Sequence, residues 1–210
     1  MICLGAPGCS ENNETKNNTK NKISADITAK DHGFVLAEAQ ASPCLKEKFR
    51  EADHKGQLTK AWKSLQSFYE LSEPERMEVK STEDSFSGFW VDPAQLLIAD
   101  NHCQAHLVDT IVHEASHVLL AHLTDGVSAT TPFRFFDEGF AMIHQHMYAN
   151  SIEDYRQTAF NVAGTELEGG NAVNFEAVQD WDTYFNTAMA YEVGATFDFF
   201  PSRASLRLCR

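Results

Sequence analysis

Two histidines four residues apart, with a glutamate directly after the first, are the part of this sequence best suited to metal chemistry. They are His113, Glu114 and His117, in the stretch VHEASHVLLAHL. On an α-helix, residues i and i+4 differ by about 40° and one turn, so both imidazoles can reach one ion. Glu114 lies about 100° round the helix from His113, where its carboxylate can reach a water on that ion without binding the ion. The spacing predicts two ligands and a general base, while a pair of hydrogen-bonded core histidines is the alternative.

These side chains need a helix to hold them, and the surrounding sequence provides one. Asp100 or Asn101 can cap a helix that runs from about residue 102 to residue 123. Its apolar positions recur with a period of about 3.6 residues. They are Leu107, Val108, Ile111, Val112, Ala115, Val118 and Leu119. A capped amphipathic helix favours the metal interpretation over a chance match in a loop.

Glu138 is the candidate for a third ligand, because it opens the next predicted helix in the stretch FFDEGFA. An antiparallel neighbouring helix can bring it back to the first. HEASH followed by FFDEGFA resembles the gluzincin metallopeptidases, the thermolysin-like and aminopeptidase-N-like clan, in which a glutamate follows H-E-x-x-H after about 18 to 20 residues. Downstream, AYEVGATFDFF at 190–200 resembles the clan's Y-x-x-G-A/S helix. The three motifs stand in the order of the clan and cover roughly residues 86 to 200.

The resemblance implies a zinc-dependent peptidase that acts on a peptide or protein substrate. Carried over residue by residue, it implies that His113, His117 and Glu138 bind Zn²⁺. Glu114 would be the general base, and Tyr191 would donate a hydrogen bond to the oxyanion of the tetrahedral intermediate. For Tyr191 a simple core aromatic residue remains the alternative.

In zincins generally, a strand at the sheet edge just before the metal helix pairs with the peptide backbone. The stretch SFSGFWVDP occupies that place, and an exposed edge can add a substrate strand by main-chain hydrogen bonds. Gly88, Phe89 and Trp90 are therefore the candidate substrate-binding residues. An ordinary core strand with both aromatic side chains packed inside is the alternative.

Two further acids lie close to the motifs in the sequence. Asp109 precedes His113 by four residues and can accept a hydrogen bond from its imidazole, although an ordinary surface acid is favoured. Asp137 is interpreted as a first-turn acid that interacts with the helix N-terminus rather than as a ligand. The alternative to an enzyme is a catalytically inactive zincin-fold binding module, which has no need of a base or an oxyanion donor.

Composition and charge limit the classes of partner. The chain of 210 residues is 43% hydrophobic, enough for a real core, and carries a net charge of −13. Such an acidic chain is unsuited to nucleic acid, which is bound through a basic face. No apolar run reaches about 18 residues, so no membrane span is predicted. We expect a monomer.

The predicted fold is α+β and zincin-like, with a small mixed sheet and helices followed by a mainly helical half that carries the zinc site. Residues 1–23, in which a short apolar start is followed by a polar stretch, are predicted to be a disordered tether. Residues 24–210 are predicted to form a single domain. It comprises an α/β part at 24–100, the helical zinc-site half at 101–200 and a tail at 201–210.

The cysteines give an indication of the cellular compartment in which the protein is found. The apolar start of the chain up to Cys9 resembles the end of a bacterial lipoprotein signal, in which Cys9 would carry the lipid anchor. We therefore expect export to the bacterial cell envelope or periplasm, with a cytoplasmic location as the alternative. In an exported chain Cys44 and Cys103 are the natural disulfide pair, and two buried free thiols are the alternative.

Overall fold

A four-stranded sheet and a long central helix organise the computed structural model of the protein, which describes residues 32–70, 76–126, 134–168 and 195. The elements of these segments are β1 (Phe34–Leu36), the short helix η1 (Glu38–Gln40), α1 (Pro43–His54), α2 (Gln57–Tyr69), β2 (Met77–Thr82), β3 (Gly88–Trp90), β4 (Gln95–Ala99), α3 (Asp100–Leu123), α4 (Arg134–Tyr148) and α5 (Ile152–Glu168). The prediction of an α+β fold with a small mixed sheet is confirmed.

The sheet has the order β1-β2-β4-β3, with β1, β2 and β4 parallel and β3 antiparallel to β4. The chain between β1 and β2 forms α1 and α2, as a parallel pair requires a long crossover connection. In contrast, β3 and β4 are joined by a short turn. This places β3 at one edge of the sheet, next to the strand that leads directly into α3.

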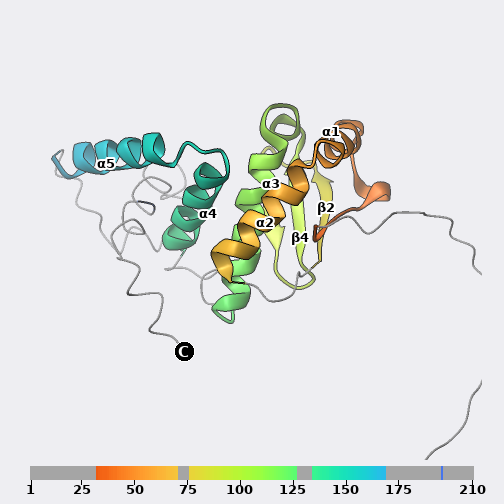
Figure 1. The fold of residues 1–210 in the computed structure, drawn as a ribbon, viewed down its shortest axis with the longest axis horizontal. Coiled ribbons are helices and arrows are strands. Elements are labelled where there is room, and N and C mark those ends of the chain that lie inside the picture. The colour runs from red at the N-terminus through yellow and green to blue at the C-terminus, as the bar shows by residue number, and fades with distance from the viewer. Residues whose placement is uncertain (1–31, 71–75, 127–133, 169–194, 196–210) are drawn as a thin grey trace, which may run out of the picture.

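Side chains on the strands alternate between two faces of the sheet. One face is buried and joins the main hydrophobic core through Phe34, Met77, Val79, Leu96 and Ile98. Helix α3 packs against β2, β3 and β4, and it also contacts α1, α2 and α4. Figure 1 shows α2 and α3 running across the sheet, with α4 and α5 on the side of α3 away from the sheet. Because α3 lies at the centre of these layers, residues on its different sides meet different elements.

The helical segment that opens at Pro43 is divided into two helices. Ser42 caps α1, since its hydroxyl accepts a hydrogen bond from the backbone amide of Leu45 at 3.2 Å. Gly56 has φ of 70°, a left-handed conformation that favours glycine, and it separates α1 from α2. This division lets the two helices pack against α3 separately.

Helix α3 is longer than expected and is not continuous. It begins at Asp100 immediately after β4, so Ala99 occupies the capping position and gives no side-chain cap. The backbone at His106 departs from helical geometry, with φ −147° and ψ 41°. The segment that carries His113 and His117 therefore starts after this kink.

A disulfide joins Cys44 in α1 to Cys103 in the first part of α3. Of the two alternatives left by the sequence, the structure has the covalent bond. It links elements whose cysteines are 59 residues apart in the chain. No helix among the described segments combines the length and the apolar character that a membrane crossing needs.

Candidate metal centre

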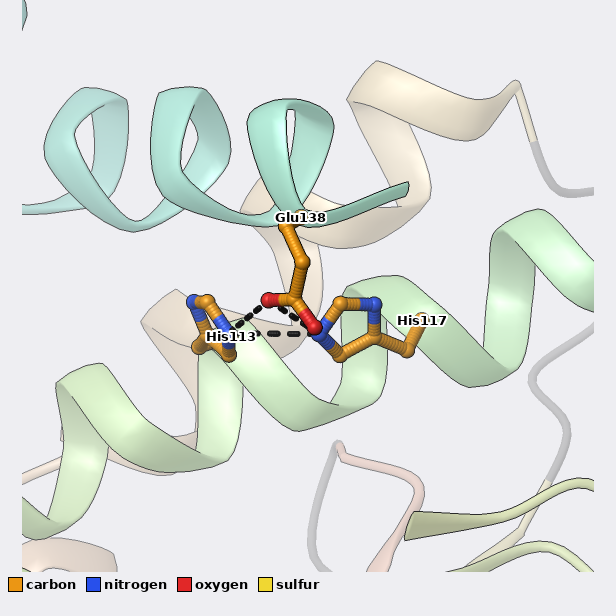
Figure 2. Close-up of side chains that lie close together, drawn as sticks. All are labelled: His113, His117 and Glu138. Atoms are coloured by element: carbon orange, nitrogen blue, oxygen red, sulfur yellow. Dashed lines mark hydrogen bonds and ion pairs between the residues drawn. The ribbon is translucent and has the colours of Figure 1, made fainter. Parts of the chain in front are cut away.

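Three potential ligands converge between α3 and α4. Helix α3 presents His113 and His117 one turn apart, and α4 presents Glu138 from the opposite side, as Figure 2 shows. The Nε2 atoms of the two histidines lie 3.2 Å apart. Each of them lies 3.3 Å from Oε2 of Glu138. The arrangement forms a nearly equilateral triangle of atoms that carry lone pairs, and among the described residues it is the group suited to holding a metal ion.

His117 is fixed by contacts on its other atoms. Its Nδ1 lies 2.8 Å from Oδ2 of Asp137, and both side chains are buried. The ring of Phe89, from β3, stacks on the His117 ring with centroids 4.7 Å apart and an interplanar angle of 16°. One nitrogen is thus held by a carboxylate and one ring face by an aromatic side chain. These contacts direct the remaining nitrogen, Nε2, toward His113 and Glu138.

The cluster concentrates negative charge in a buried place. Burial acts to raise the pKa of Glu138, but the charges and hydrogen bonds of His117 and His113 outweigh it and hold that pKa well below its usual value. Burial likewise acts to lower the pKa of His117, and the charges of Glu138 and Asp137 raise it to about 10. The buried carboxylates of Asp137 and Glu138 therefore need a compensating positive charge. A proton on the imidazole of His117 or a bound cation can provide it.

Asp137 lies in the first turn of α4, as predicted, and it is not part of the ligand triangle. The structure adds a contact that was not predicted, because the carboxylate of Asp137 lies against His117. A ligating imidazole generally donates its other N–H to such an acceptor, which fixes the tautomer and makes the ligand more basic. The sequence feature that could have indicated this contact is the pair of consecutive acids, Asp137 and Glu138. Neighbouring residues on one turn can engage the two nitrogens of one imidazole from the same helix.

The other predicted site residues are distributed as follows. Glu114 is on α3, directly after His113, and the residue is 7% exposed. Phe89 and Trp90 lie on β3, but only Phe89 contacts the cluster, while Trp90 is exposed. Tyr191 lies outside the described residues. The structure therefore brings the three candidate ligands and the predicted substrate strand together, and Glu114 itself is buried.

The remaining histidines and Asp109 have other surroundings. His102 contacts the hydroxyl of Ser87 at 2.8 Å, and His122 contacts the carbonyl oxygen of Val91 at 3.2 Å. His144 is buried, and its ring nitrogens contact Ser64 of α2 and Ser116 of α3. Asp109 is half-buried, which raises its pKa, while the nearby charges of His106 and His146 oppose that rise. None of these contacts makes Asp109 a partner of the ligand triangle.

Comparison of the chain with protein-family models, with curated proteins and with solved structures found no match. Three features of the chain bear on its function: the ligand triangle, the contact between Asp137 and His117, and the adjacent edge strand.

Proposed function

We propose that this protein is a zinc-dependent peptidase of the gluzincin type, with a zincin-like fold. The observation that carries the proposal is the triangle formed by His113 Nε2, His117 Nε2 and Glu138 Oε2, with sides of 3.2 to 3.3 Å. Two imidazole nitrogens and one carboxylate oxygen make up the three protein ligands that a catalytic zinc site uses, leaving its fourth position open.

The spacing of the three atoms is the spacing expected around a tetrahedral zinc ion. Zinc binds nitrogen and oxygen at about 2.0 to 2.1 Å in tetrahedral geometry, which separates neighbouring ligand atoms by about 3.3 Å. The sides of the triangle agree with that value. Calcium and magnesium favour oxygen ligands, and calcium binds them at longer distances, so two imidazole nitrogens disfavour both. The donor set thus supports zinc as the resident ion.

When bound, zinc supplies Lewis acidity, which makes a water more acidic and a carbonyl carbon more electrophilic. The residues of the chain supply the proton transfers. A carboxylate oxygen of Glu114 accepts a proton from the attacking water and later gives it to the leaving amine. The hydroxyl of Tyr191 donates a hydrogen bond to the oxyanion that develops on the carbonyl oxygen. Asp137 holds Nδ1 of His117 and so keeps that ring oriented throughout.

Two further features support parts of this proposal. The edge strand β3 lies against the cluster through Phe89, so a peptide paired with it would pass close to the ligands. The disulfide between Cys44 and Cys103 favours an oxidising compartment, in agreement with export to a cell envelope or periplasm.

The test is Glu114→Gln, which removes the base and keeps the size of the side chain. The purified protein should contain one zinc per chain and hydrolyse peptides from a broad library. The variant should retain the zinc and lose hydrolysis by a factor of about 100 or more. Glu47→Gln, a change at an exposed position of α1, is the matched control and should behave as the parent.

Zinc-free protein after careful preparation, or undiminished hydrolysis by Glu114→Gln, would contradict the proposal. A protein that binds zinc and peptides but hydrolyses none would be the inactive binding module instead.

A further inference from the structure

His144 of α4 connects three helices beside the candidate metal centre. The residue is wholly buried. Its Nδ1 lies 3.1 Å from the hydroxyl oxygen of Ser116 on α3, and its Nε2 lies 3.4 Å from that of Ser64 on α2. A serine hydroxyl can donate or accept a hydrogen bond, so both ring nitrogens have a partner in either tautomer. We call these two interactions the His144 contacts.

The partner of His144 on α3 belongs to the turn that carries two of the candidate ligands. Ser116 directly precedes His117, and Val112 directly precedes His113. The hydroxyl of Ser116 donates to the carbonyl oxygen of Val112 at 2.7 Å. In addition, Tyr69 of α2 donates its hydroxyl hydrogen to the carbonyl oxygen of Ser116 at 3.3 Å. The His144 contacts therefore reach α4 from the turn of α3 on which both histidines stand.

Helix α4 meets α3 through polar side chains on two of its faces. Glu138 extends from α4 toward the two histidines of α3, as Figure 2 shows. His144 follows Glu138 by six residues, which places it about 9 Å farther along the helix and about 240° around it. One face thus carries the candidate ligand, and another carries the contact with Ser116. Two contacts on different faces oppose rotation of α4 about its own axis.

A small rotation of α4 would disturb the metal centre. Side chains reach about 5 to 6 Å from the axis of a helix, so a rotation of about 10° moves the tip of Glu138 by about 1 Å. Bonds between zinc and its ligands keep to their usual lengths within about 0.2 Å. Apolar burial is not directional, whereas a hydrogen bond weakens steeply when the angle at the donor falls. The His144 contacts are therefore suited to fix the rotation of α4.

We infer that His144 is a positioning residue for the metal centre. By holding α4 against Ser116 and Ser64, it keeps the carboxylate of Glu138 where an ion bound by the two histidines can be reached. A buried polar group that is fully hydrogen-bonded favours one arrangement of the helices around it. The inference rests on the proposed function, from which it takes the bound ion, and it names a residue outside the ligand triangle that sets the affinity for that ion.

The affinity of the full-length protein for Zn²⁺ is measured in competition with a chelating dye, and the visible absorption is measured after loading with Co²⁺. His144→Leu keeps a large apolar side chain in the core but removes both hydrogen-bonding nitrogens. It should weaken zinc binding about 10-fold, the lower end of the range for residues that orient ligands. The Co²⁺ absorption should also change, because it depends on the arrangement of the ligands.

His144→Gln is the conservative variant, since its amide can both donate and accept. It should restore most of the affinity lost in His144→Leu. Ser64→Ala removes one of the two contacts from a helix that carries no ligand, and it should weaken zinc binding in the same direction by a smaller factor. This variant also serves as the test if His144→Leu does not fold.

Ile143→Val is the matched control on α4. Ile143 is buried in a different apolar cluster, with Tyr155 and Ala159 of α5. Removing one methyl group there should lower the urea midpoint of the metal-free protein, while zinc affinity and the Co²⁺ absorption stay as in the parent. A loss of stability alone therefore leaves the metal centre unchanged, and a loss of the His144 contacts does not.

Equal zinc affinity in the parent, His144→Leu and Ser64→Ala would overturn the inference. Equal losses in His144→Leu and Ile143→Val would overturn it too, because the effect would then follow from stability alone. No recovery in His144→Gln would assign the loss to packing instead of hydrogen bonding.

Failure of the proposed function gives a different pattern. A parent that binds zinc but hydrolyses no peptide refutes the peptidase activity and leaves the role of His144 intact. A parent that binds neither ion refutes the metal centre, and the inference falls with it.

Discussion

His144 gives this protein a predictable loss of stability in acid. The residue is 0% exposed, and it contacts α2 and α3. Its nitrogens contact the hydroxyls of Ser64 at 3.4 Å and Ser116 at 3.1 Å, and its ring packs on Phe68 and Tyr69. Burial lowers the pKa of His144 to about 4, and a hydrogen bond with the Ser64 backbone offsets only part of that effect. The folded protein therefore holds this histidine neutral.

The sign and size of the effect follow from linkage between protonation and folding. In the unfolded chain the pKa of His144 is near 6.5, so below that pH the unfolded state takes up the proton first. Stability is complete above about pH 6.5 and falls as the pH drops toward 4. The full difference between the two pKa values corresponds to about 3 kcal/mol, of which about 2 kcal/mol is lost by about pH 5.

Urea unfolding of the parent and His144→Gln at about pH 7.5 and about pH 5 measures this directly. Glutamine keeps hydrogen-bonding groups but does not titrate, so its packing cost is the same at both pH values and cancels. Both proteins are measured in chelator, which removes any contribution from metal binding. The free energy of unfolding should fall by about 2 kcal/mol more in the parent than in the variant. An equal fall in both proteins would show that His144 is not the group that takes up the proton.

Two other predictions concern contacts that α3 makes with α1 and α4, namely the disulfide and the contact between Asp137 and His117. Replacing Cys44 and Cys103 with alanine opens a loop that spans 59 residues, so the free energy of unfolding should fall by about 4 kcal/mol in urea melts; an unchanged urea midpoint would contradict the role of the disulfide. Asp137→Asn removes the charge beside His117 and should weaken zinc binding about 10- to 100-fold in competition with a chelating dye. Asp109→Asn is its matched control, and equal losses in the two variants would refute a specific role for Asp137.

Much of the candidate centre was predictable because helical geometry is local. The spacing of His113 and His117 requires only that the segment be a helix, and the structure has that helix. The approach of Glu138 depends on an antiparallel helix pair, which the family pattern suggested and the residue spacing alone does not determine. The first-turn position of Asp137 follows from its own helix and was predicted, whereas its contact with His117 depends on the facing helix and was not.

In the sheet too, the features that depend on local sequence were predictable, and those that depend on contacts between distant residues were not. The small mixed sheet that was predicted ahead of the mainly helical half is present, and β1 to β4 all lie before residue 100. Their order and the parallel pairing of β2 with both β1 and β4 depend on contacts between distant parts of the chain. The segment around His106 contains no glycine or proline, so its kink could not be predicted from the sequence. The predicted helix that includes Tyr191 lies outside the described residues.

Because α3 contacts both α1 and α4, it would be cross-linked to its neighbours by two chemically independent links. The disulfide secures its beginning to α1, and an ion held by His113, His117 and Glu138 would secure its later turns to α4. A reductant opens the first and leaves the second intact, while a chelator does the reverse. Loss of one link would leave the other in place. The stability of the folded state would therefore depend separately on the redox state and on the metal supply of the surroundings.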